Sequence, residues 1–438
     1  MQKRTPANDM RTSLRGIANR ARRDRKARFR DVYRLLNEEN LRDCFYRLHR
    51  SAAPGVDRVT FEEYERNLDT NLADLVKRLK EKRYRAKLVR RKYIPKGNGK
   101  LRPLGIPALE DKLLQKAAAQ VLTAIYEQDF LDCSWAYRAG RGPREASRVL
   151  EHQLHYGKIG WVVEADIRGF YDNISHEWMM RMLEERVADG AFLHLIGKWL
   201  KAGVLEEDGK VMHPATGTPQ GGIVSPVLAN IYLHYVLDLW VECSVRKECQ
   251  GEMFMIRFAD DFVTAFQYRA DAVRFKKVLS ERLGKFGLAV AEDKTRMLQF
   301  GRYAPEPNEK FEFLGFEFRW VRRRAGKMGV CRWTAPKKLH ASVRAFTQWL
   351  KESYHNRVSR LMKEVSRKLS GYWNYYGVRG NMERMNRLYY QCRRLLFKWL
   401  NRRSQKRSYT WEGFEAMLQL FCVPTPRIVE LPAQPSLL

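Results

Sequence analysis

Apolar residues in the first third of the chain recur mainly at helical spacing. From Val32 to His49, and again from Thr60 to Leu79, they return every three or four positions, which predicts two amphipathic helical regions. Thr60 and Glu63 have the spacing of a capping box, so we expect the second region to begin there. The stretch from Val89 to Leu104 predicts two short strands around an Asn-Gly turn, and Ala108 to Tyr126 predicts a long helix.

Strand patterns are prominent in the middle of the chain. The segment Trp161 to Asp166 predicts a buried strand, and the apolar runs on both sides of Ala259-Asp260-Asp261 predict the arms of a β-hairpin. The other predicted elements are a helix from the turn-rich stretch 216–226 to about 240, a helix at 272–286, and strands at 288–290 and 311–316. Together these elements predict an α+β fold.

The final third changes to long helical patterns. Residues 341–410 carry 17 Lys and Arg against three acidic residues, with twelve aromatic residues among them. Aromatic and arginine side chains interleaved along helices are typical of RNA recognition by stacking and phosphate contact. The alternative is a helical bundle with aromatic residues inside and basic residues outside, and both arrangements can hold in one region.

The charge of the whole chain favours a polyanionic partner. Its 438 residues hold 82 Lys and Arg against 50 Asp and Glu, a net charge of +32, and the isoelectric point is near 10.0. Residues 1–30 hold eleven basic residues against two Asp, which predicts an extended or loosely helical arm on phosphates or, alternatively, a disordered solubilising tail. Nucleic acid fits better than a membrane surface, because no run of 18 apolar residues occurs.

The seven cysteines are scattered and show no Cys-x-x-Cys spacing, so we expect neither a zinc site nor disulfides. The N-terminus lacks the apolar core of a secretory signal, and both observations predict a cytoplasmic protein. An Arg-rich organellar transit peptide is the alternative, and the oligomeric state stays open.

The pair Asp260-Asp261 carries the clearest sign of chemistry. Two adjacent carboxylates at the tip of a largely buried hairpin repel each other, and a divalent cation neutralises them most simply. Hard carboxylate oxygens suit Mg²⁺, which also shares its coordination shell with phosphates. If the strand that ends at Asp166 lies beside the hairpin, three carboxylates can hold two ions for phosphoryl transfer. A solvated Asp-Asp turn is the alternative that this stretch alone leaves open.

Two loops have features of phosphate or nucleotide binding. The predicted hairpin at 89–104 places Lys96 and Arg102 on either side of its turn, where an ammonium and a guanidinium can grip a triphosphate. A solvated basic hairpin is the alternative. In the stretch 216–226, glycines allow the backbone to approach a ligand closely.

Several short motifs follow one another in a fixed order: Ala53-Pro54-Gly55-Val56-Asp57, Ile94-Pro95-Lys96, Arg102-Pro103-Leu104-Gly105-Ile106-Pro107, Asp166, Thr218-Pro219-Gln220-Gly221-Gly222, Ala259-Asp260-Asp261, Glu292-Asp293-Lys294-Thr295, Phe313-Leu314-Gly315-Phe316 and Pro426-Arg427-Ile428. In this order they resemble the reverse transcriptases of the bacterial group II intron type. Each motif alone is weak, but their common register outweighs the solvated-turn alternative for Asp260-Asp261.

The resemblance implies an α+β right-hand polymerase, in which fingers and a palm with an antiparallel sheet precede an all-helical thumb or maturase region. The implied divisions are a basic N-terminal extension at 1–50, fingers at 51–165, a palm with part of the fingers inserted at 166–320, the thumb at 335–430 and a short tail at 431–438. An RNA template, a DNA primer, dNTPs and intron RNA are the implied partners, without a membrane.

The resemblance also implies roles for individual residues. Asp166, Asp260 and Asp261 would be catalytic and, with the backbone carbonyl of Ile167, would hold two Mg²⁺ ions. The nucleotide-binding residues would be Lys96, Arg102, Tyr171, Gln220 and Lys294, with Tyr171 as the steric gate against a ribose 2′-OH. In the basic helical region we expect RNA contacts from Arg393, Arg394, Arg402, Arg403, Tyr372 and Trp373.

Three features depart from the family pattern. Phe258 stands where the family usually has Tyr, so a hydroxyl is missing beside the Asp pair, with consequences for primer contact or fidelity. The stretch Ser134-Trp135-Ala136-Tyr137-Arg138-Ala139-Gly140 differs from the commoner Ser-Tyr-Gly-Phe-Arg-Pro form. No Cys/His cluster follows the predicted thumb, so we expect no HNH endonuclease domain.

Three functions remain open at this point. The first is an intron-encoded reverse transcriptase and maturase that assists splicing and copies its RNA into DNA. The second is a host-adopted relative in DNA repair or phage defence, which the DNA flanking the gene would distinguish. The third is an RNA-binding splicing maturase without polymerase activity, against which the three intact carboxylates argue.

Overall fold

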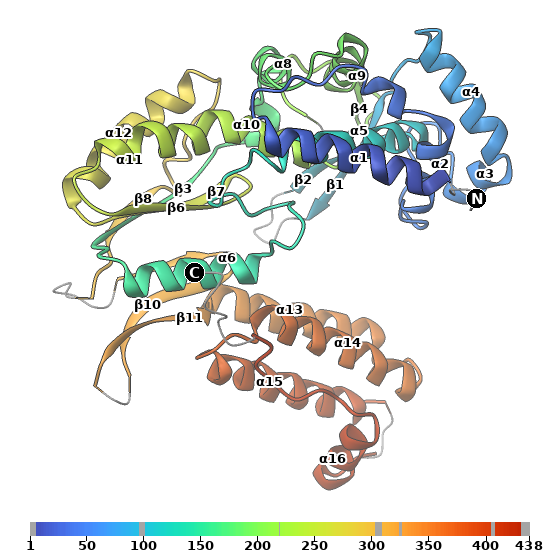
Figure 1. The fold of residues 1–438 in the computed structure, drawn as a ribbon. Coiled ribbons are helices and arrows are strands. Elements are labelled where there is room, and N and C mark those ends of the chain that lie inside the picture. Colours follow the sequence, from blue (N-terminus) through green and yellow to red (C-terminus); the bar gives the residue numbers. More distant parts are fainter. Residues whose placement is uncertain are drawn as a thin grey trace, which may run out of the picture.

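The computed structural model describes residues 6–95, 101–218, 220–302, 309–323, 326–403 and 408–430, with side chains from residue 13 onward. Its helices and strands form a largely helical N-terminal part with a small four-stranded sheet, a central four-stranded sheet, and a three-stranded sheet followed by a helical C-terminal part (Figure 1). The predicted α+β class, with antiparallel sheets before a helical region, is therefore confirmed.

The N-terminal part packs short helices around the long helix α5. Its elements are α1 (Pro6–Arg23), α2 (Glu38–Tyr46), α3 (Phe61–Arg66), α4 (Leu68–Lys80), β1 (Val89–Pro95), β2 (Leu101–Ile106) and α5 (Leu109–Tyr126). The basic N-terminal segment is helical over α1, which packs on α5. Arg186 is buried beneath the end of α1 and donates hydrogen bonds to the carbonyls of Ala21 and Asp24.

Two predicted helices are interrupted by asparagines. The expected helix from Val32 to His49 is instead a 3-10 turn at Tyr33–Leu35 followed by α2, because the Asn37 side chain caps the new helix by accepting from the Asn40 amide. The Thr60 capping box forms as predicted: the Glu63 amide donates to the Thr60 hydroxyl, and the Thr60 amide donates to the Glu63 carboxylate. Asn67 then separates α3 from α4.

The central part is built on a four-stranded antiparallel sheet in the order β6-β7-β3-β8. Its strands are β3 (Trp161–Asp166), β6 (Met253–Phe258), β7 (Asp261–Phe266) and β8 (Arg296–Gln299). The surrounding elements are α6 (Pro143–Tyr156), α7 (Phe170–Asn173), α8 (His176–Glu184), α9 (Gly190–Leu200), β4 (Val204–Leu205), β5 (Val211–Met212), α10 (Ser225–Leu233), the π-helical turns His234–Asp238 and Val241–Val245, α11 (Arg246–Glu248) and α12 (Arg269–Gly284).

The side chains of this sheet alternate between two hydrophobic cores. Val163 and Phe262 join the core shared with α12 and the N-terminal helices, whereas their neighbours Val162 and Val263 join the core beneath α6 and the second sheet. Figure 1 shows α12 and α6 on opposite faces of the sheet, in agreement with their contacts. Because both faces are covered, the strands carry apolar side chains on both sides and are held in one register.

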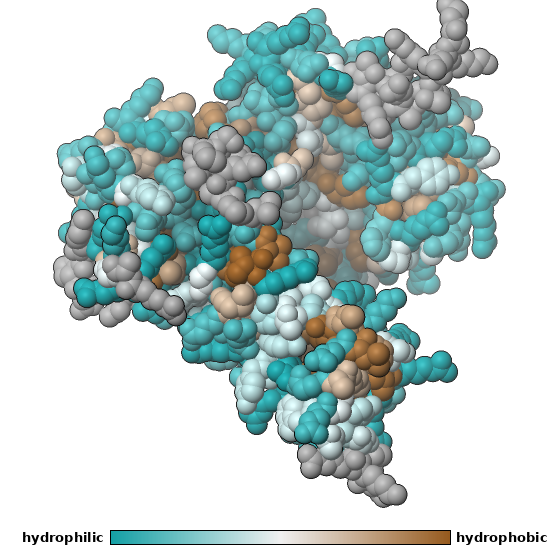
Figure 2. Space-filling model, turned by 60° about the horizontal axis from the view of Figure 1, so that its bottom comes forward, coloured by the Kyte–Doolittle hydropathy of each residue, from teal (hydrophilic) through white to brown (hydrophobic). Residues whose placement is uncertain are grey.

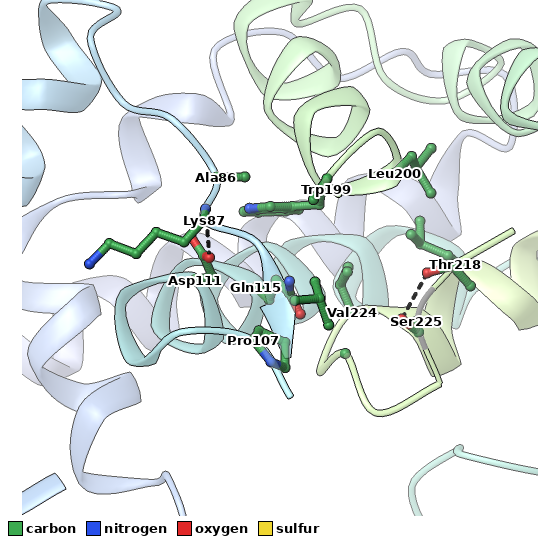
Figure 3. A pocket seen from close by; sticks show the side chains of 14 residues that line it. Ala86, Lys87, Pro107, Asp111, Gln115, Trp199, Leu200, Thr218, Val224 and Ser225 are labelled. Carbon is green, nitrogen blue, oxygen red and sulfur yellow. Dashed lines mark hydrogen bonds between the residues drawn. The ribbon is translucent and has the colours of Figure 1, made fainter. Parts of the chain in front are cut away.

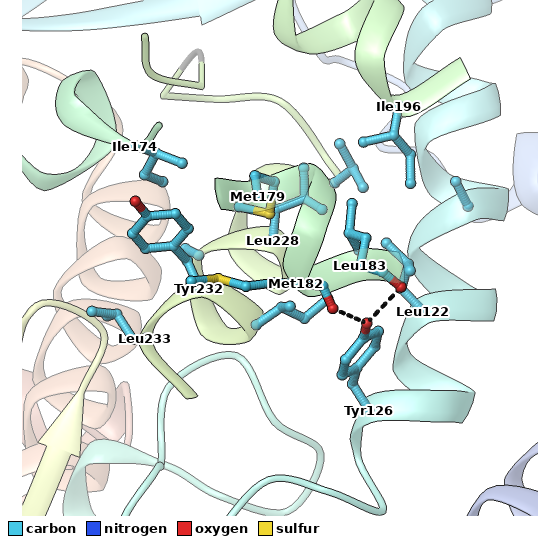
Figure 4. Packing of buried hydrophobic residues seen from close by; sticks show 14 of the residues in the cluster. Leu122, Tyr126, Ile174, Met179, Met182, Leu183, Ile196, Leu228, Tyr232 and Leu233 are labelled. Atoms are coloured by element: carbon cyan, nitrogen blue, oxygen red, sulfur yellow. Dashed lines mark hydrogen bonds between the residues drawn. The ribbon is translucent and has the colours of Figure 1, made fainter. Parts of the chain in front are cut away.

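The larger core connects the N-terminal and central parts. In Figure 4, Tyr126 at the end of α5 points toward α8, and its hydroxyl donates to the carbonyl of Met182 or Leu183, 3.1 and 3.2 Å away. Leu122, Ile196 and Leu228 pack beside it without exposure to solvent. These contacts tie α5 to the helices that flank the central sheet.

The C-terminal part joins a three-stranded sheet to a bundle of helices. The strands are β9 (Lys310–Phe313), β10 (Phe316–Arg322) and β11 (Met328–Thr334), and the helices are α13 (Pro336–Ser353), α14 (Val358–Tyr376), α15 (Met382–Leu400) and α16 (Trp411–Leu420). The sequence pattern predicted one strand at 311–316. A turn at Leu314 and Gly315, both with positive φ, instead divides it between β9 and β10.

Candidate active site

The central sheet brings the three predicted aspartates to one edge. Asp166 ends β3 and Asp261 begins β7, and the strand register pairs these two residues directly. Asp260 follows Ala259 in the turn that joins β6 to β7 and immediately precedes Asp261. The condition set by the sequence, that the two segments be neighbouring strands, is therefore met.

The negative charge of this edge is only partly neutralised. The pKa of Asp261 is raised to about 7, mainly by burial and also by the nearby carboxylates of Asp166, Glu164 and Asp260, while Lys294 opposes the shift. The Lys294 ammonium pairs with Asp166 Oδ2, and this hydrogen bond raises the pKa of Lys294. One ammonium thus faces several carboxylates, which leaves the edge favourable for further cations.

The carboxylates share an edge but are not preassembled around an ion. Within the described ranges, no group of three or more His, Cys, Asp and Glu side chains is arranged to hold a metal. Lys294 occupies one oxygen of Asp166. The donor set still suits Mg²⁺, since its oxygens are hard and the carboxylates of Asp166, Glu164 and Asp260 add to the effect of burial in raising the pKa of Asp261.

Tyr171 lies beside this edge on a short helix. Gly169 adopts φ +54, which starts α7 immediately after the strand that carries Asp166. Burial, and a contact of 3.4 Å with the Tyr137 hydroxyl, raise the pKa of Tyr171; Asp260 raises it as well and Arg102 lowers it. Asp260 and Arg102 therefore both lie within electrostatic reach of Tyr171.

The glycine-rich loop at 216–222 is docked against both β2 and α7. The Gly105 amide donates to the carbonyl of Gln220 at 2.6 Å, and the Thr218 amide donates to the carbonyl of Tyr171 at 2.8 Å. Gly221 has φ +116, and a Cβ added there would lie 2.4 Å from the Gly105 carbonyl oxygen. Only glycine fits this approach, and it places Gln220 next to the strand that carries Arg102.

A small cavity behind the loop shows how the loop is supported. Figure 3 shows Thr218 bonded to Ser225, and Asp111 accepting from the backbone amide of Lys87 at 3.1 Å. Burial raises the pKa of Asp111 to about 6, although its hydrogen bonds oppose this shift. The cavity has a volume of about 10 Å³, room for roughly one water. It belongs to the packing beneath the loop.

Of the two residues expected to hold the triphosphate, only Arg102 lies within the described part of the chain. Arg102 lies exposed on β2, opposite Ile94 in the hairpin register. Lys96 lies outside the described residues, as does Pro219 of the loop. The two arms of the predicted hairpin are confirmed as β1 and β2.

The predicted RNA-binding residues of the helical part fall into three environments. Trp373 is fully buried in the bundle and donates to the Pro424 carbonyl at 3.1 Å, so the prediction of an RNA contact there is wrong. The reason is helical phase, because Trp373 lies on the apolar face of α14 with Leu369. Tyr372 is half-buried against Trp373 and Tyr376, and burial raises its pKa to about 12.

The four predicted arginines also differ. Arg393 pairs with Glu415, and Arg403 donates to the Asn356 carbonyl at 2.7 Å. The guanidinium of Arg394 lies 5.6 Å from the Tyr390 ring centroid, and that of Arg402 lies 5.3 Å from the ring of Trp399. No ion pair of Arg394 or Arg402 is present among the described side chains.

A groove beside Arg394 was missed by sequence reasoning. It measures about 480 Å³ and is lined on α15 by Tyr390, Arg394 and Lys398, and on α16 by Trp411. Tyr390 is 58% exposed and Trp411 is 44% exposed. The face shown in Figure 2 is mostly hydrophilic, with hydrophobic residues in small separate areas. The spacing of four residues from Tyr390 to Arg394 to Lys398 was the available signal.

Among the described residues, no helix is long and apolar enough to cross a membrane.

Residues 94–318 match the protein family described as "Reverse transcriptase (RNA-dependent DNA polymerase)". Protein YkfC of Escherichia coli (strain K12) is 34% identical over 310 residues, which cover 63% of this chain and 78% of YkfC. Group II intron-encoded protein LtrA of Lactococcus lactis subsp. cremoris is 36% identical over 225 residues, covering 46% of this chain and 37% of LtrA. Among solved structures, telomerase from Candida albicans in complex with a TWJ fragment of telomeric RNA aligns with a TM-score of 0.43 and 14% identity, covering 83% of this chain and 66% of that one.

Proposed function

Because the chain belongs to the reverse transcriptase family and is of the group II intron type, we propose that it extends a DNA primer on an RNA template with dNTPs. The observation that carries this proposal is the direct pairing of Asp166 with Asp261 beside Asp260 at one sheet edge. The raised pKa of Asp261 supports the proposal, because burial and three neighbouring carboxylates both contribute to it.

The three aspartates and the carbonyl of Ile167 would hold two Mg²⁺ ions. When bound, the metals activate a primer 3′-OH and neutralise the departing pyrophosphate. The protein's own contribution is to fix the carboxylates, because Asp166 and Asp261 are locked by the strand register. Lys294, which holds Asp166 in this structure, would move to a phosphate when a nucleotide binds.

The remaining nucleotide contacts surround this edge. Lys96 and Arg102 would hold the triphosphate, Gln220 would lie beside the incoming nucleotide, and the Tyr171 ring would exclude a ribose 2′-OH. The docking of the loop on both β2 and α7 supports this arrangement, since it couples the position of Gln220 to that of Tyr171. The central sheet would then be the palm, with fingers before it and a thumb in α13–α16.

We also propose that the protein binds intron RNA and assists its splicing. The net charge of +32 and the groove of Tyr390, Arg394 and Trp411 support a surface that contacts RNA by stacking and charge. LtrA is described as a group II intron-encoded protein, and the match spans 37% of its length. A role in DNA repair or phage defence would use the same chemistry and a different RNA.

Primer extension by an Asp260→Asn variant tests the polymerase proposal. The amide cannot neutralise a metal, so we expect DNA synthesis on an RNA template to fall to background while RNA affinity stays within about twofold. Asp208→Asn, in the exposed β4–β5 turn, is the control for loss of one carboxylate. Substantial synthesis by Asp260→Asn would remove the catalytic assignment, and an inactive wild-type protein that binds RNA would favour a splicing maturase without polymerase activity.

A further inference from the structure

A fully buried arginine lies directly beneath the turn that carries Asp260. Arg257 is the second-last residue of β6, and its side chain is 0% exposed. Its fork meets Asp238 twice: Nε donates to Oδ1 at 2.7 Å and Nη2 donates to Oδ2 at 2.5 Å. Asp238 is also 0% exposed and lies in the π-helical turn that continues α10. The two charges therefore neutralise each other inside the core.

The other donors of Arg257 reach three further segments. Nη2 donates to Ser134 Oγ at 2.7 Å, and Nη1 donates to Asn230 Oδ1 at 3.2 Å. Nη1 also donates to the Ala259 carbonyl at 3.1 Å. The backbone of Arg257 is paired as well, because its amide donates to Cys133 and its carbonyl accepts from Trp135. One guanidinium thus joins the hairpin to α10 and to the strand-like segment at 133–135.

The contact with Ala259 links this network to the proposed metal ligands. Ala259 has φ +58, a left-handed conformation that is uncommon for alanine and persists only where the surroundings impose it. The Ala259 carbonyl and the Asp260 amide belong to one planar peptide group. Holding that oxygen therefore fixes the orientation in which the chain enters Asp260.

Stability alone does not explain a charged pair at this place. Replacing a buried ion pair with apolar residues of similar volume is often neutral or stabilising. The fork geometry of arginine does explain it, because a single rigid group reaches Asp238, Ser134, Asn230 and the turn at once.

We propose that Arg257 is a positioning residue, which with Asp238 holds the Ala259–Asp260 peptide so that Asp260 and Asp261 present their carboxylates correctly to the metal ions. This inference rests on the proposed polymerase function. It predicts that the geometry of the guanidinium is required, because a lysine retains the charge next to Asp238 but cannot span to Ser134 and the Ala259 carbonyl together.

The test compares Arg257→Lys with Arg332→Lys in the full-length protein. Arg332, on β11 of the three-stranded sheet, is a matched control, because it is also buried, at 1% exposure, and its guanidinium binds Glu151 and Glu430. In Arg257→Lys we expect the kcat for single-nucleotide incorporation to fall at least about tenfold, with the dNTP KM within about threefold. The Mg²⁺ concentration for half-maximal activity should rise several-fold. In Arg332→Lys the kcat and the Mg²⁺ concentration for half-maximal activity should stay near wild type when measured below the Tm of that variant.

A second readout is independent of activity. Mn²⁺ binding to the protein without nucleic acid, followed by electron paramagnetic resonance, should weaken several-fold in Arg257→Lys and not in Arg332→Lys. If Arg257→Lys does not fold, the double variant Arg257→Met with Asp238→Leu removes both buried charges and carries the same expectations.

The outcomes separate this inference from the proposed function. A wild-type protein that neither extends primers nor binds Mn²⁺ overturns both. If the wild type is active and Arg257→Lys either equals it or loses activity only as far as its Tm falls, the positioning role is overturned and the polymerase proposal stands.

Discussion

Replacing Gly221 by alanine tests whether the loop at 216–222 sets the geometry of nucleotide binding. At φ +116 the new side chain would place Cβ 2.4 Å from the carbonyl oxygen of Gly105. Favourable contact between such atoms begins near 3.5 Å, so the loop and β2 must separate by about 1 Å. Neither side can yield by rotating a side chain, because both are backbone and the Gly105 amide bonds Gln220 at 2.6 Å. The conformation itself adds a strain of about 1–3 kcal/mol for a residue with a Cβ.

A displacement of about 1 Å in a residue that positions substrate lowers activity by about 100-fold. We therefore expect the kcat/KM for dNTP incorporation by Gly221→Ala to fall by about that factor, with RNA affinity unchanged. Gly209→Ala is the matched control, since it also has positive φ, +87, but no atom within 4 Å of the added Cβ. Single-nucleotide incorporation and thermal unfolding are measured for both variants. Near-normal dNTP incorporation by Gly221→Ala would show that the loop does not set the nucleotide site.

Three further predictions address other parts of the site. Tyr171→Ala should admit rNTPs, because the ring no longer fills the space beside the ribose 2′ position; an unchanged ratio of rNTP to dNTP incorporation in an active variant would assign the gate elsewhere. The pKa of Asp261 is raised to about 7 in the folded protein, so its carboxyl contributes stability at low pH that is lost as the pH rises through about 7. Mg²⁺ should therefore raise Tm more at pH 8, where this carboxyl is ionised, than at pH 6. If Asp261→Asn shows the same difference between the two pH values, the assignment to Asp261 is refuted. Replacing Arg394 and Arg402 by Gln should reduce the slope of log RNA affinity against log salt by about 0.7 per lost phosphate contact. The same replacement of Arg393, which pairs with Glu415, and of Arg403, which donates to Asn356, should change the slope less. Equal slopes in the two double variants would refute this difference between the two pairs.

The elements of the site that follow from local sequence were predictable. The hairpin at Asp260 and the strand ending at Asp166 each rest on short apolar runs, and both form where expected. The direct pairing of Asp166 with Asp261 depends on which strands become neighbours, which periodicity alone does not determine. From the sequence, this pairing could be stated only on the condition that the strand ending at Asp166 lies beside the hairpin. The order of the motifs, which resembles that of the group II intron type, supported that condition.

Helical phase limited what could be said of the C-terminal helices. Tyr372 and Trp373 lie in the densest aromatic stretch, but density does not say which face of α14 is buried. Trp373 is on the inner face with Leu369, whereas the exposed Tyr390 lies on α15 in a stretch with fewer aromatic neighbours. Aromatic content therefore indicated the right region, and the residues within it had to come from the packing of one helix against another.

Arg257 shows a different limit. A charged residue within the run Met255-Ile256-Arg257-Phe258 is out of place in a strand buried on both faces, and that alone signals a partner in the core. The partner is Asp238, nineteen residues earlier and on a helix rather than a neighbouring strand. No spacing rule connects the two, because their contact exists only once α10 has packed against the sheet. A charged residue in an apolar run therefore indicates that a buried partner is needed. Tertiary packing determines which residue that partner is, and that the pair of Arg257 and Asp238 lies against the turn at Ala259.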